Sequence, residues 1–183
     1  MTIRGACRLV DSGWAYRRWY AHARLVVGKL AAATDTETGR VADVLAVTSP
    51  RRSVASNLRV AYRYLRGDGL PRDVVRSVRV SLDHYDRTGE IRGPKTSAFA
   101  LALRGDNSVV VVDTHVATAF GYRPQDARTV WVRTIIGGVL RRVATRRGVS
   151  VVEAQAALWA GYYRTAYPTG RIPMYRWASI VPF

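Results

Sequence analysis

The sequence predicts an all-α fold. Apolar residues recur every three or four positions through most of the chain, which is the spacing of helices with one buried face. Helix-start signals precede several of these stretches, and the one run typical of a strand is the four valines at 109–112. We therefore expect a helical protein whose only extended segment lies near residues 109–112.

Four helices are predicted in the first half. The apolar stripe of residues 14–33 forms the first, and Thr34–Glu37 has the pattern of a capping box that opens the second. Ser49, followed by Pro50, opens the third, because Ser is a common helix cap and Pro fits the first helical position. Pro71 opens the fourth in the same way.

The central stretch contains two further helix starts. A tight turn at residues 92–93 leads into a helix opened by Pro94, which ends near residues 104–105. Asp113 follows the four valines and can cap another, short helix. Lys95 and Asp113 are therefore an amine and a carboxylate at two helix starts, eighteen residues apart in the sequence. Such an arrangement favours two side chains that point into a single cleft.

Two more helices are predicted in the C-terminal third, within a single domain of residues 14–166. A capping box at Ser150–Glu153 opens the last of them. Residues 1–13 and 167–183 show no helical period, and we expect them to form a flexible arm and an irregular tail. The residues of the preceding long helix that we expect to face inward are Val130, Trp131, Ile135, Val139 and Val143.

The charge of the chain points to a polyanionic partner. There are 29 basic and 13 acidic residues, for a net charge of +16. Neutralisation of phosphates supplies most non-specific affinity for nucleic acids, so this excess is typical of a nucleic-acid-binding protein. Only Lys29 and Lys95 are lysines. An amine, unlike a guanidinium group, can lose its proton and act as a nucleophile, so Lys95 in the central stretch is a candidate catalytic residue.

Several classes of protein are excluded. No apolar run approaches the ~18 residues that span a bilayer, and the N-terminal residues lack the apolar core of a signal peptide. Cys7 is the only cysteine, so no disulfide framework can form. Metal-ligand spacings and phosphate-binding glycine loops are also missing. We expect a monomeric cytoplasmic protein, associated with the nucleoid, that binds no membrane, metal or cofactor.

The central stretch resembles the helix-hairpin-helix DNA glycosylases of the endonuclease III type. In that family a hairpin of the form Leu-Pro-Gly-Val-Gly-Arg-Lys-Thr-Ala is followed, at the same spacing, by Val-Asp-Thr-His. Residues 91–97 and 112–115 of this chain read Ile-Arg-Gly-Pro-Lys-Thr-Ser and Val-Asp-Thr-His. Lys95 and Asp113 fall where the family has its Schiff-base lysine and its catalytic aspartate. A fainter likeness extends from residues 30–35 to residues 157–162.

This resemblance implies two helical subdomains that flank a DNA-binding cleft, with a helix-hairpin-helix motif. The partner would be double-stranded DNA, from which the enzyme flips a modified or mispaired base and cleaves its N-glycosidic bond. Asp113 would stabilise the positive charge on the sugar, and Lys95 would attack C1′ to form the Schiff base of an AP lyase. The residues assigned to DNA binding are Arg92, Gly93, Thr96 and Ser97.

Two departures and two alternatives accompany the resemblance. Ile91 replaces the first hairpin glycine, and the four cysteines that hold an iron–sulfur cluster in many members are absent, so no such cluster can form. One alternative is a transferase on the same fold that modifies DNA bases. The other is a DNA-binding module in which Asp113 is only a helix cap and Lys95 a phosphate contact. The aromatic residues that either line a base pocket or belong to the core are Trp19, Phe120, Trp159 and Tyr162.

Overall fold

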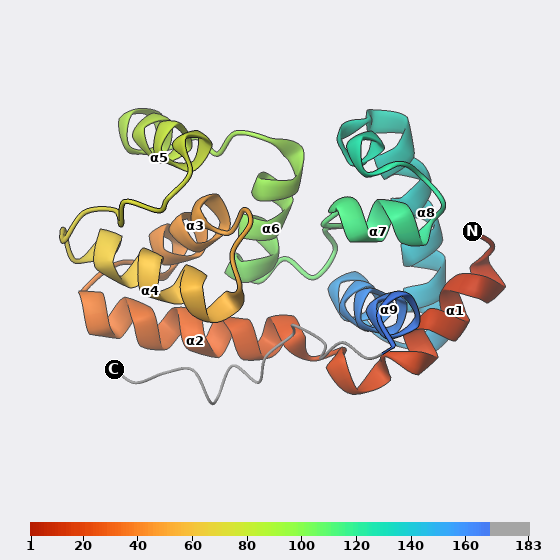
Figure 1. The fold of residues 1–183 in the computed structure, drawn as a ribbon. Helices are drawn as coiled ribbons and strands as arrows, with labels where there is room; N and C mark the ends of the chain where they lie inside the picture. The colour runs from red at the N-terminus through yellow and green to blue at the C-terminus, as the bar shows by residue number, and fades with distance from the viewer. Residues whose placement is uncertain (169–183) are drawn as a thin grey trace. The chain divides into compact units, whose positions relative to one another are not determined.

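A computed structural model describes residues 1–168, and every regular element in that part of the chain is helical. The predicted all-α fold is confirmed. The four valines at 109–112 lie in non-helical backbone and form no strand. The described residues fall into two compact units, unit 1 of residues 1–21 and 106–168 and unit 2 of residues 22–105 (Figure 1).

Unit 1 is built from both ends of the described chain. The N-terminal end supplies α1 (Ile3–Ser12) and a short 3-10 helix, η1 (Trp14–Tyr16). The elements after residue 106 are α7 (Thr114–Ala119), the 3-10 helix η2 (Pro124–Arg128), α8 (Val130–Arg147) and α9 (Val151–Ala166). Since α9 contacts α1, η1, α7 and α8, it is the central helix of this unit.

Unit 2 is a bundle of helices around α3. Its elements are α2 (Trp19–Thr34), which begins just before the unit, α3 (Thr38–Thr48), α4 (Val54–Leu65), α5 (Arg76–Thr88) and α6 (Pro94–Arg104). α3 contacts α4, α5 and α6. All of residues 41–48 are buried, since α3 contacts helices on several sides. Six of them are apolar, and the two polar ones, Asp43 and Thr48, are hydrogen-bonded.

The first residues form a helix where the sequence analysis expects a flexible arm. The Thr2 side chain caps α1 by accepting a hydrogen bond from the Gly5 N–H at 3.1 Å, and Ala6 and Val10 are fully buried. A Cβ atom built on Gly161 of α9 would lie 1.9 Å from the Leu9 carbonyl oxygen. The two helices therefore pack backbone against backbone. Ile3, Ala6, Cys7 and Val10 have the i, i+3, i+4, i+7 spacing of a helix with one buried face, so the expectation that residues 1–13 have no helical period is wrong. The irregular tail is predicted for residues 167–183. Residues 169–183 of it lie outside the part of the chain that the structure describes.

The inward face of α8 also differs from the prediction. Its fully buried residues are Val132, Ile136, Leu140 and Val143. Three residues that were expected to face inward are instead exposed, namely Val130 at 73%, Trp131 at 57% and Ile135 at 46%. Apolar residues occupy two adjoining faces of this helix, so the period alone cannot decide between them. The face chosen in the structure is the one that joins the core of α1, α7 and α9.

Three of the predicted helix starts are wrong. The Thr34 hydroxyl donates to the Leu30 carbonyl oxygen at 2.8 Å, which makes Thr34 the end of α2. The Ser49 hydroxyl likewise donates to the Ala46 carbonyl oxygen at 2.8 Å and closes α3. Ser53 caps α4 instead, and α5 begins at Arg76, after the predicted start at Pro71. The starts at Pro94, Asp113 and Ser150 are confirmed.

A buried polar network holds α3, α5 and α6 together. Asp43 is 1% exposed and accepts hydrogen bonds from Arg104 Nε at 2.9 Å and from the Tyr85 hydroxyl at 2.7 Å. Arg104 Nη2 donates to the second carboxylate oxygen. A buried carboxylate is stable only when its oxygens are satisfied in this way. Since Arg104 is the last residue of α6, the network fixes the helix that carries Lys95.

Candidate functional site

The connection between α5 and α6 is a short loop that needs glycine at both ends. Gly89 ends α5 with φ 72°, and Gly93 precedes Pro94 with φ 90°. These are left-handed backbone conformations that glycine adopts without steric cost. The Ser97 hydroxyl donates to the carbonyl oxygens of Ile91 and Gly93, each at 3.0 Å, and so ties the loop back onto α6.

The predicted DNA-binding residues divide into two groups. Arg92 and Gly93 are exposed in the loop, whereas Thr96 and Ser97 are half-buried in the first turn of α6. The hydroxyl proton of Ser97 is shared between two backbone carbonyl oxygens, so this side chain stabilises the loop. The surface available to a partner here is therefore formed mainly by Arg92 and Gly93.

Lys95 lies half-buried in the first turn of α6, with its amine held by two neighbours. Nζ donates a hydrogen bond to the Ser49 hydroxyl at 3.1 Å. It also lies 5.1 Å from the ring centroid of Phe99, one turn further along α6, in cation–π contact. Ser49 closes α3 and is 46 residues from Lys95 in the sequence, so the sequence analysis could not identify it as a partner.

Asp113 caps α7, as predicted, and each carboxylate oxygen accepts one hydrogen bond. The Val116 N–H donates to Oδ1 at 2.7 Å, which is the helix-cap bond. The Trp159 indole Nε1–H donates to Oδ2 at 3.1 Å from α9. The backbone cap sets the position of the carboxylate, and the indole fixes its rotation.

An aromatic cluster holds the Trp159 indole in place. Trp159 stacks on Tyr163, with ring centroids 5.2 Å apart and planes 14° from parallel. The His115 ring meets the rings of Trp159 and Tyr163 edge-on, with centroids 5.7 and 6.2 Å away. His115 therefore packs against aromatic rings beside Asp113. From the sequence, Trp159 is only one aromatic candidate among several, because its bond to Asp113 joins distant segments.

A buried glutamine fixes the segment that leads into Asp113. Gln155 of α9 is 4% exposed. Its Oε1 accepts from the Val111 N–H at 2.7 Å, and its Nε2 donates to the Val111 carbonyl oxygen at 2.8 Å. One side chain thus satisfies the buried N–H and C=O of Val111, which a neighbouring strand would otherwise have to pair.

Lys95 and Asp113 belong to different units, Lys95 to unit 2 and Asp113 to unit 1. The structure defines the surroundings of each residue within its own unit. The two helix starts predicted from the sequence are both present. That the two side chains point into one cleft stays a prediction.

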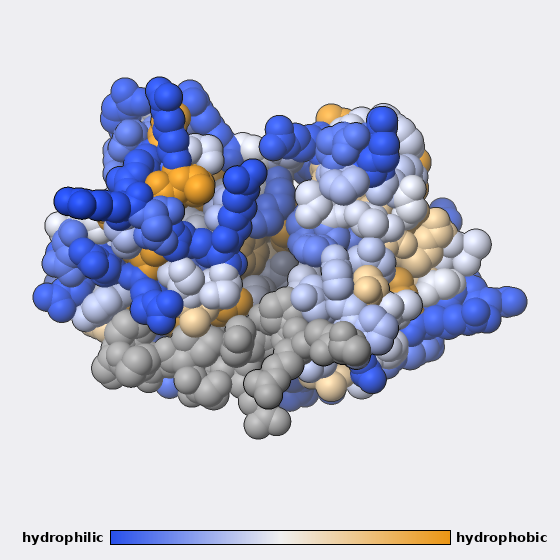
Figure 2. Space-filling view, viewed as in Figure 1, coloured by the Kyte–Doolittle hydropathy of each residue, from blue (hydrophilic) through white to orange (hydrophobic). Residues whose placement is uncertain are grey.

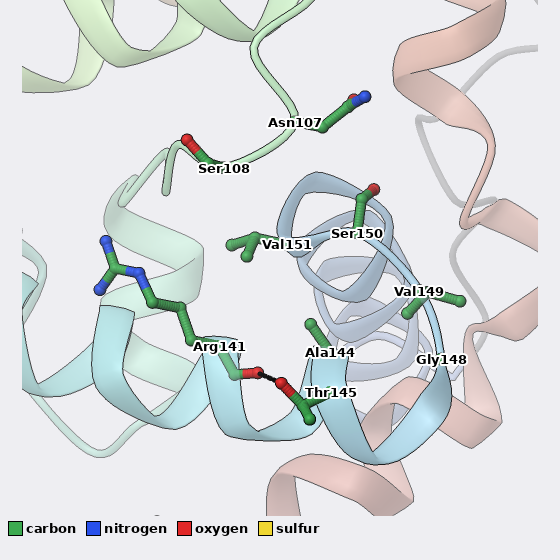
Figure 3. A pocket seen from close by; sticks show the side chains of 9 residues that line it. All are labelled: Asn107, Ser108, Arg141, Ala144, Thr145, Gly148, Val149, Ser150 and Val151. Carbon is green, nitrogen blue, oxygen red and sulfur yellow. Dashed lines mark hydrogen bonds between the residues drawn. The ribbon is translucent and has the colours of Figure 1, made fainter.

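A shallow pocket in unit 1, of about 490 Å³, lies apart from Asp113 (Figure 3). It is lined by Asn107, Ser108, Arg141, Ala144, Thr145, Gly148, Val149, Ser150 and Val151. The start of α9 borders it, but the Glu153 carboxylate already accepts hydrogen bonds from the Ser150 N–H and hydroxyl, at 2.9 and 2.8 Å. An anionic ligand would have to displace this carboxylate from the helix start, so the pocket does not favour one.

Comparison with known proteins gives a family for most of the chain. Residues 11–165 match a family described as "Family of unknown function (DUF7178)". The chain belongs to the DUF7178 family. A search of curated proteins finds no match, and neither does a search of solved structures. The part of this DUF7178 protein that matches its family contains Lys95, Asp113 and Trp159, so all three lie within the family's domain.

Two further features describe this DUF7178 chain within residues 1–168. None of the described helices is both long and apolar enough to cross a membrane. The same residues contain no cluster of three or more His, Cys, Asp or Glu side chains suited to a metal ion.

Proposed function

We propose that this DUF7178 protein is a DNA glycosylase that flips a modified or mispaired base and cleaves its N-glycosidic bond. The observation that supports this most directly is the fixed carboxylate of Asp113, which is held by one N–H donor on each oxygen. Catalysis by charge stabilisation depends on groups that are oriented before the reaction begins. Asp113 meets this requirement, and the spacing between Asp113 and Lys95 is that of the glycosylase family that the sequence resembles.

The proposed role of Asp113 is to stabilise the positive charge that develops on the sugar. When the bond from C1′ to the base breaks, the base leaves with the bonding electrons and the sugar becomes oxocarbenium-like. A carboxylate held rigidly beside C1′ lowers the energy of this state. Gln155 hydrogen-bonds both backbone groups of Val111, two residues before Asp113. This anchoring keeps the carboxylate in place as the charge develops.

The proposed role of Lys95 is covalent. Its neutral amine attacks C1′, a bond forms from Nζ to C1′, and the base departs with its electron pair and takes up a proton. The C1′–O4′ bond then breaks, the ring oxygen takes up a proton from the attacking nitrogen, and a Schiff base forms between Nζ and C1′, from which β-elimination breaks the strand. Ser49 and Phe99 hold the protonated amine before the reaction, and the amine must lose its proton to attack. The proposal requires Lys95 and Asp113 to reach the same extruded nucleotide.

In this proposal the partner is double-stranded DNA, bound by a monomer in a cleft flanked by two helical subdomains. α5, the loop and α6 form the helix-hairpin-helix motif, with Arg92, Gly93, Thr96 and Ser97 as its DNA contacts. The net charge of +16 supports a polyanionic partner. Figure 2 shows hydrophilic side chains over much of α4 and α5, and the exposed arginines of these helices are Arg59, Arg63, Arg76 and Arg87.

The decisive experiment is a screen of duplexes that each carry one modified or mispaired base. Excision produces an abasic site, which alkali converts into a strand break, and borohydride traps the Schiff base of a lyase. We expect at least one duplex to give both signals. A base retained with altered mass would replace the proposal with a base-modifying transferase. Duplex binding with neither signal for any base would replace it with a DNA-binding module.

A further inference from the structure

The outward face of α8 carries an exposed apolar surface that the core of unit 1 does not use. Trp131 and Ile135 lie outside the buried side of this helix, at 57% and 46% exposed. One edge of the indole is already in contact, because the Trp131 ring meets the Tyr122 ring edge-on with centroids 5.5 Å apart, and the rest of the indole is open. Residues at positions i, i+4, i+7 and i+11 lie on one side of a helix. Four residues of α8 have this spacing on its outer side, and we name them the α8 stripe: Trp131, Ile135, Gly138 and Arg142.

Gly138 leaves a gap in the middle of the α8 stripe. A Cβ atom built at this position would have no atom within 4 Å, in contrast with Gly137, whose Cβ would meet Arg141 at 3.1 Å and Val110 at 3.6 Å. Glycine in a helix interior costs about 1 kcal/mol relative to alanine. Close packing does not explain Gly138. Its consequence is an open surface between the side chains of Ile135 and Arg142.

The surroundings of the stripe are strongly basic. α8 contains no acidic residue, and the preceding η2 contains only Asp126, which pairs with Arg123 at 3.2 Å. Arg147 pairs with Asp11. The other arginines of η2 and α8 have no ion-pair partner within residues 1–168: Arg128, Arg133, Arg141, Arg142 and Arg146. Of these, Arg142 and Arg146 lie on the same side of α8 as Trp131 and Ile135, whereas Arg133 lies on the opposite side. An exposed aromatic ring with cations further along the same side of the helix is suited to a ligand with both a flat apolar face and negative charge.

We infer that the α8 stripe binds single-stranded DNA. Unpaired bases offer their faces for stacking on the Trp131 indole and the Ile135 side chain, while Arg142 and its basic neighbours neutralise the phosphates. In a regular duplex these base faces are already stacked, so the indole could not reach them. A second copy of this chain would bring the same unpaired arginines to the interface, and charge repulsion therefore disfavours self-association. This surface uses neither Lys95 nor Asp113.

The test is a titration of the full chain with a fluorescein-labelled oligothymidylate of roughly 16 nucleotides, the upper end of known site sizes, followed by anisotropy. Trp131→Ala should weaken binding about 5- to 100-fold, the loss typical of one base–aromatic stack. Trp131→Phe keeps a stacking ring and should retain most of the affinity. Leu25→Ala is the matched control, because Leu25 is 68% exposed on α2 in unit 2 and should bind as the wild type does.

A second variant blocks the surface without removing any contact. Gly138→Leu places a side chain in open space, so the fold should persist while binding weakens. Wild-type affinity for Trp131→Ala, or an equal loss for Leu25→Ala, would overturn the inference. So would a wild-type dimer in sedimentation that Trp131→Ala dissociates, because the stripe would then be a protein interface. The oligothymidylate carries no damaged base, so this outcome is independent of whether the proposed excision activity exists.

Discussion

The Trp159 indole and the Asp113 carboxylate are joined by a hydrogen bond of 3.1 Å across 46 residues of sequence. Because Trp159 also stacks on Tyr163, the indole is itself held in place. Asp113 thus has two supports of different kinds, a backbone N–H of its own helix and a side chain of α9. The two can be separated by mutation, since only the second depends on an indole N–H.

Trp159→Phe should lower the excision rate while the protein stays folded. Phenylalanine keeps an aromatic ring against Tyr163 but has no donor for Oδ2 of Asp113. A hydrogen bond to a charged group contributes about 1.5–3 kcal/mol, so we expect a single-turnover rate roughly 10- to 100-fold lower. Tyr122→Phe, which changes a half-buried ring of unit 1 that packs on Trp131 and not on the Asp113 cluster, is the control and should keep the wild-type rate. An unchanged rate for Trp159→Phe would show that the backbone cap alone orients the carboxylate.

Asp113→Asn should reduce both activity and stability. The amide oxygen can still accept the Val116 N–H, but the amide NH₂ then faces the indole N–H, so two donors meet. A buried donor left without an acceptor costs about 1–3 kcal/mol, which urea unfolding would measure. Loss of the charge should lower the excision rate roughly 10²- to 10³-fold.

A double variant separates these two effects. Asp113→Asn combined with Trp159→Phe removes the opposed donors, so stability should recover relative to Asp113→Asn alone while activity stays low. If activity recovered together with stability, the carboxylate would have a structural role and no catalytic one.

Lys95→Gln should abolish the borohydride-trapped complex, because glutamine cannot form a Schiff base. Its effect on duplex affinity should be only a few-fold, since one phosphate contact among several contributes modestly. Lys29→Gln is the matched control, as Lys29 is the other lysine of the chain and is exposed on α2. If trapping survived in Lys95→Gln and disappeared in Lys29→Gln, the nucleophile would be Lys29 and the proposed role of Lys95 would be wrong.

Features that depend on residues close together in the sequence can be predicted from it, whereas features that depend on contacts between distant segments cannot. The starts at Pro94, Asp113 and Ser150 could be predicted because a cap involves residues within three or four positions of one another. α1 is missed although Ile3, Ala6, Cys7 and Val10 have helical spacing. The buried face of α8 could not be predicted, since it depends on packing against distant helices. The partners of the two candidate catalytic residues, Ser49 and Trp159, are missed for the same reason. Each lies 46 residues from the group that it holds.

Stability should fall between pH 10 and about 12 through the network around Asp43. Burial and the hydrogen bond to Asp43 raise the pKa of Tyr85 from 10.0 to about 12. The folded state therefore favours the neutral phenol, and this stabilisation is complete below pH 10 and lost as the pH rises through about 12. Burial and Asp86 also raise the pKa of Tyr64, so Tyr85→Phe should reduce the fall in urea-unfolding free energy without abolishing it. A pH profile identical to that of the wild type would exclude the contribution of Tyr85.

The contact between α1 and α9 predicts opposite effects for two helical glycines. In Gly161→Ala the new Cβ would lie 1.9 Å from the Leu9 carbonyl oxygen, and a backbone atom cannot move aside as a flexible side chain can. We expect α1 to separate from α9, with a loss of about 1–3 kcal/mol in the free energy of unfolding. Gly138→Ala meets no atom within 4 Å and should gain about 0.5–1 kcal/mol, because alanine is the better helix former. Urea unfolding of the two variants measures both changes. Similar values for the two would show that α1 does not pack on α9 as closely as this geometry requires.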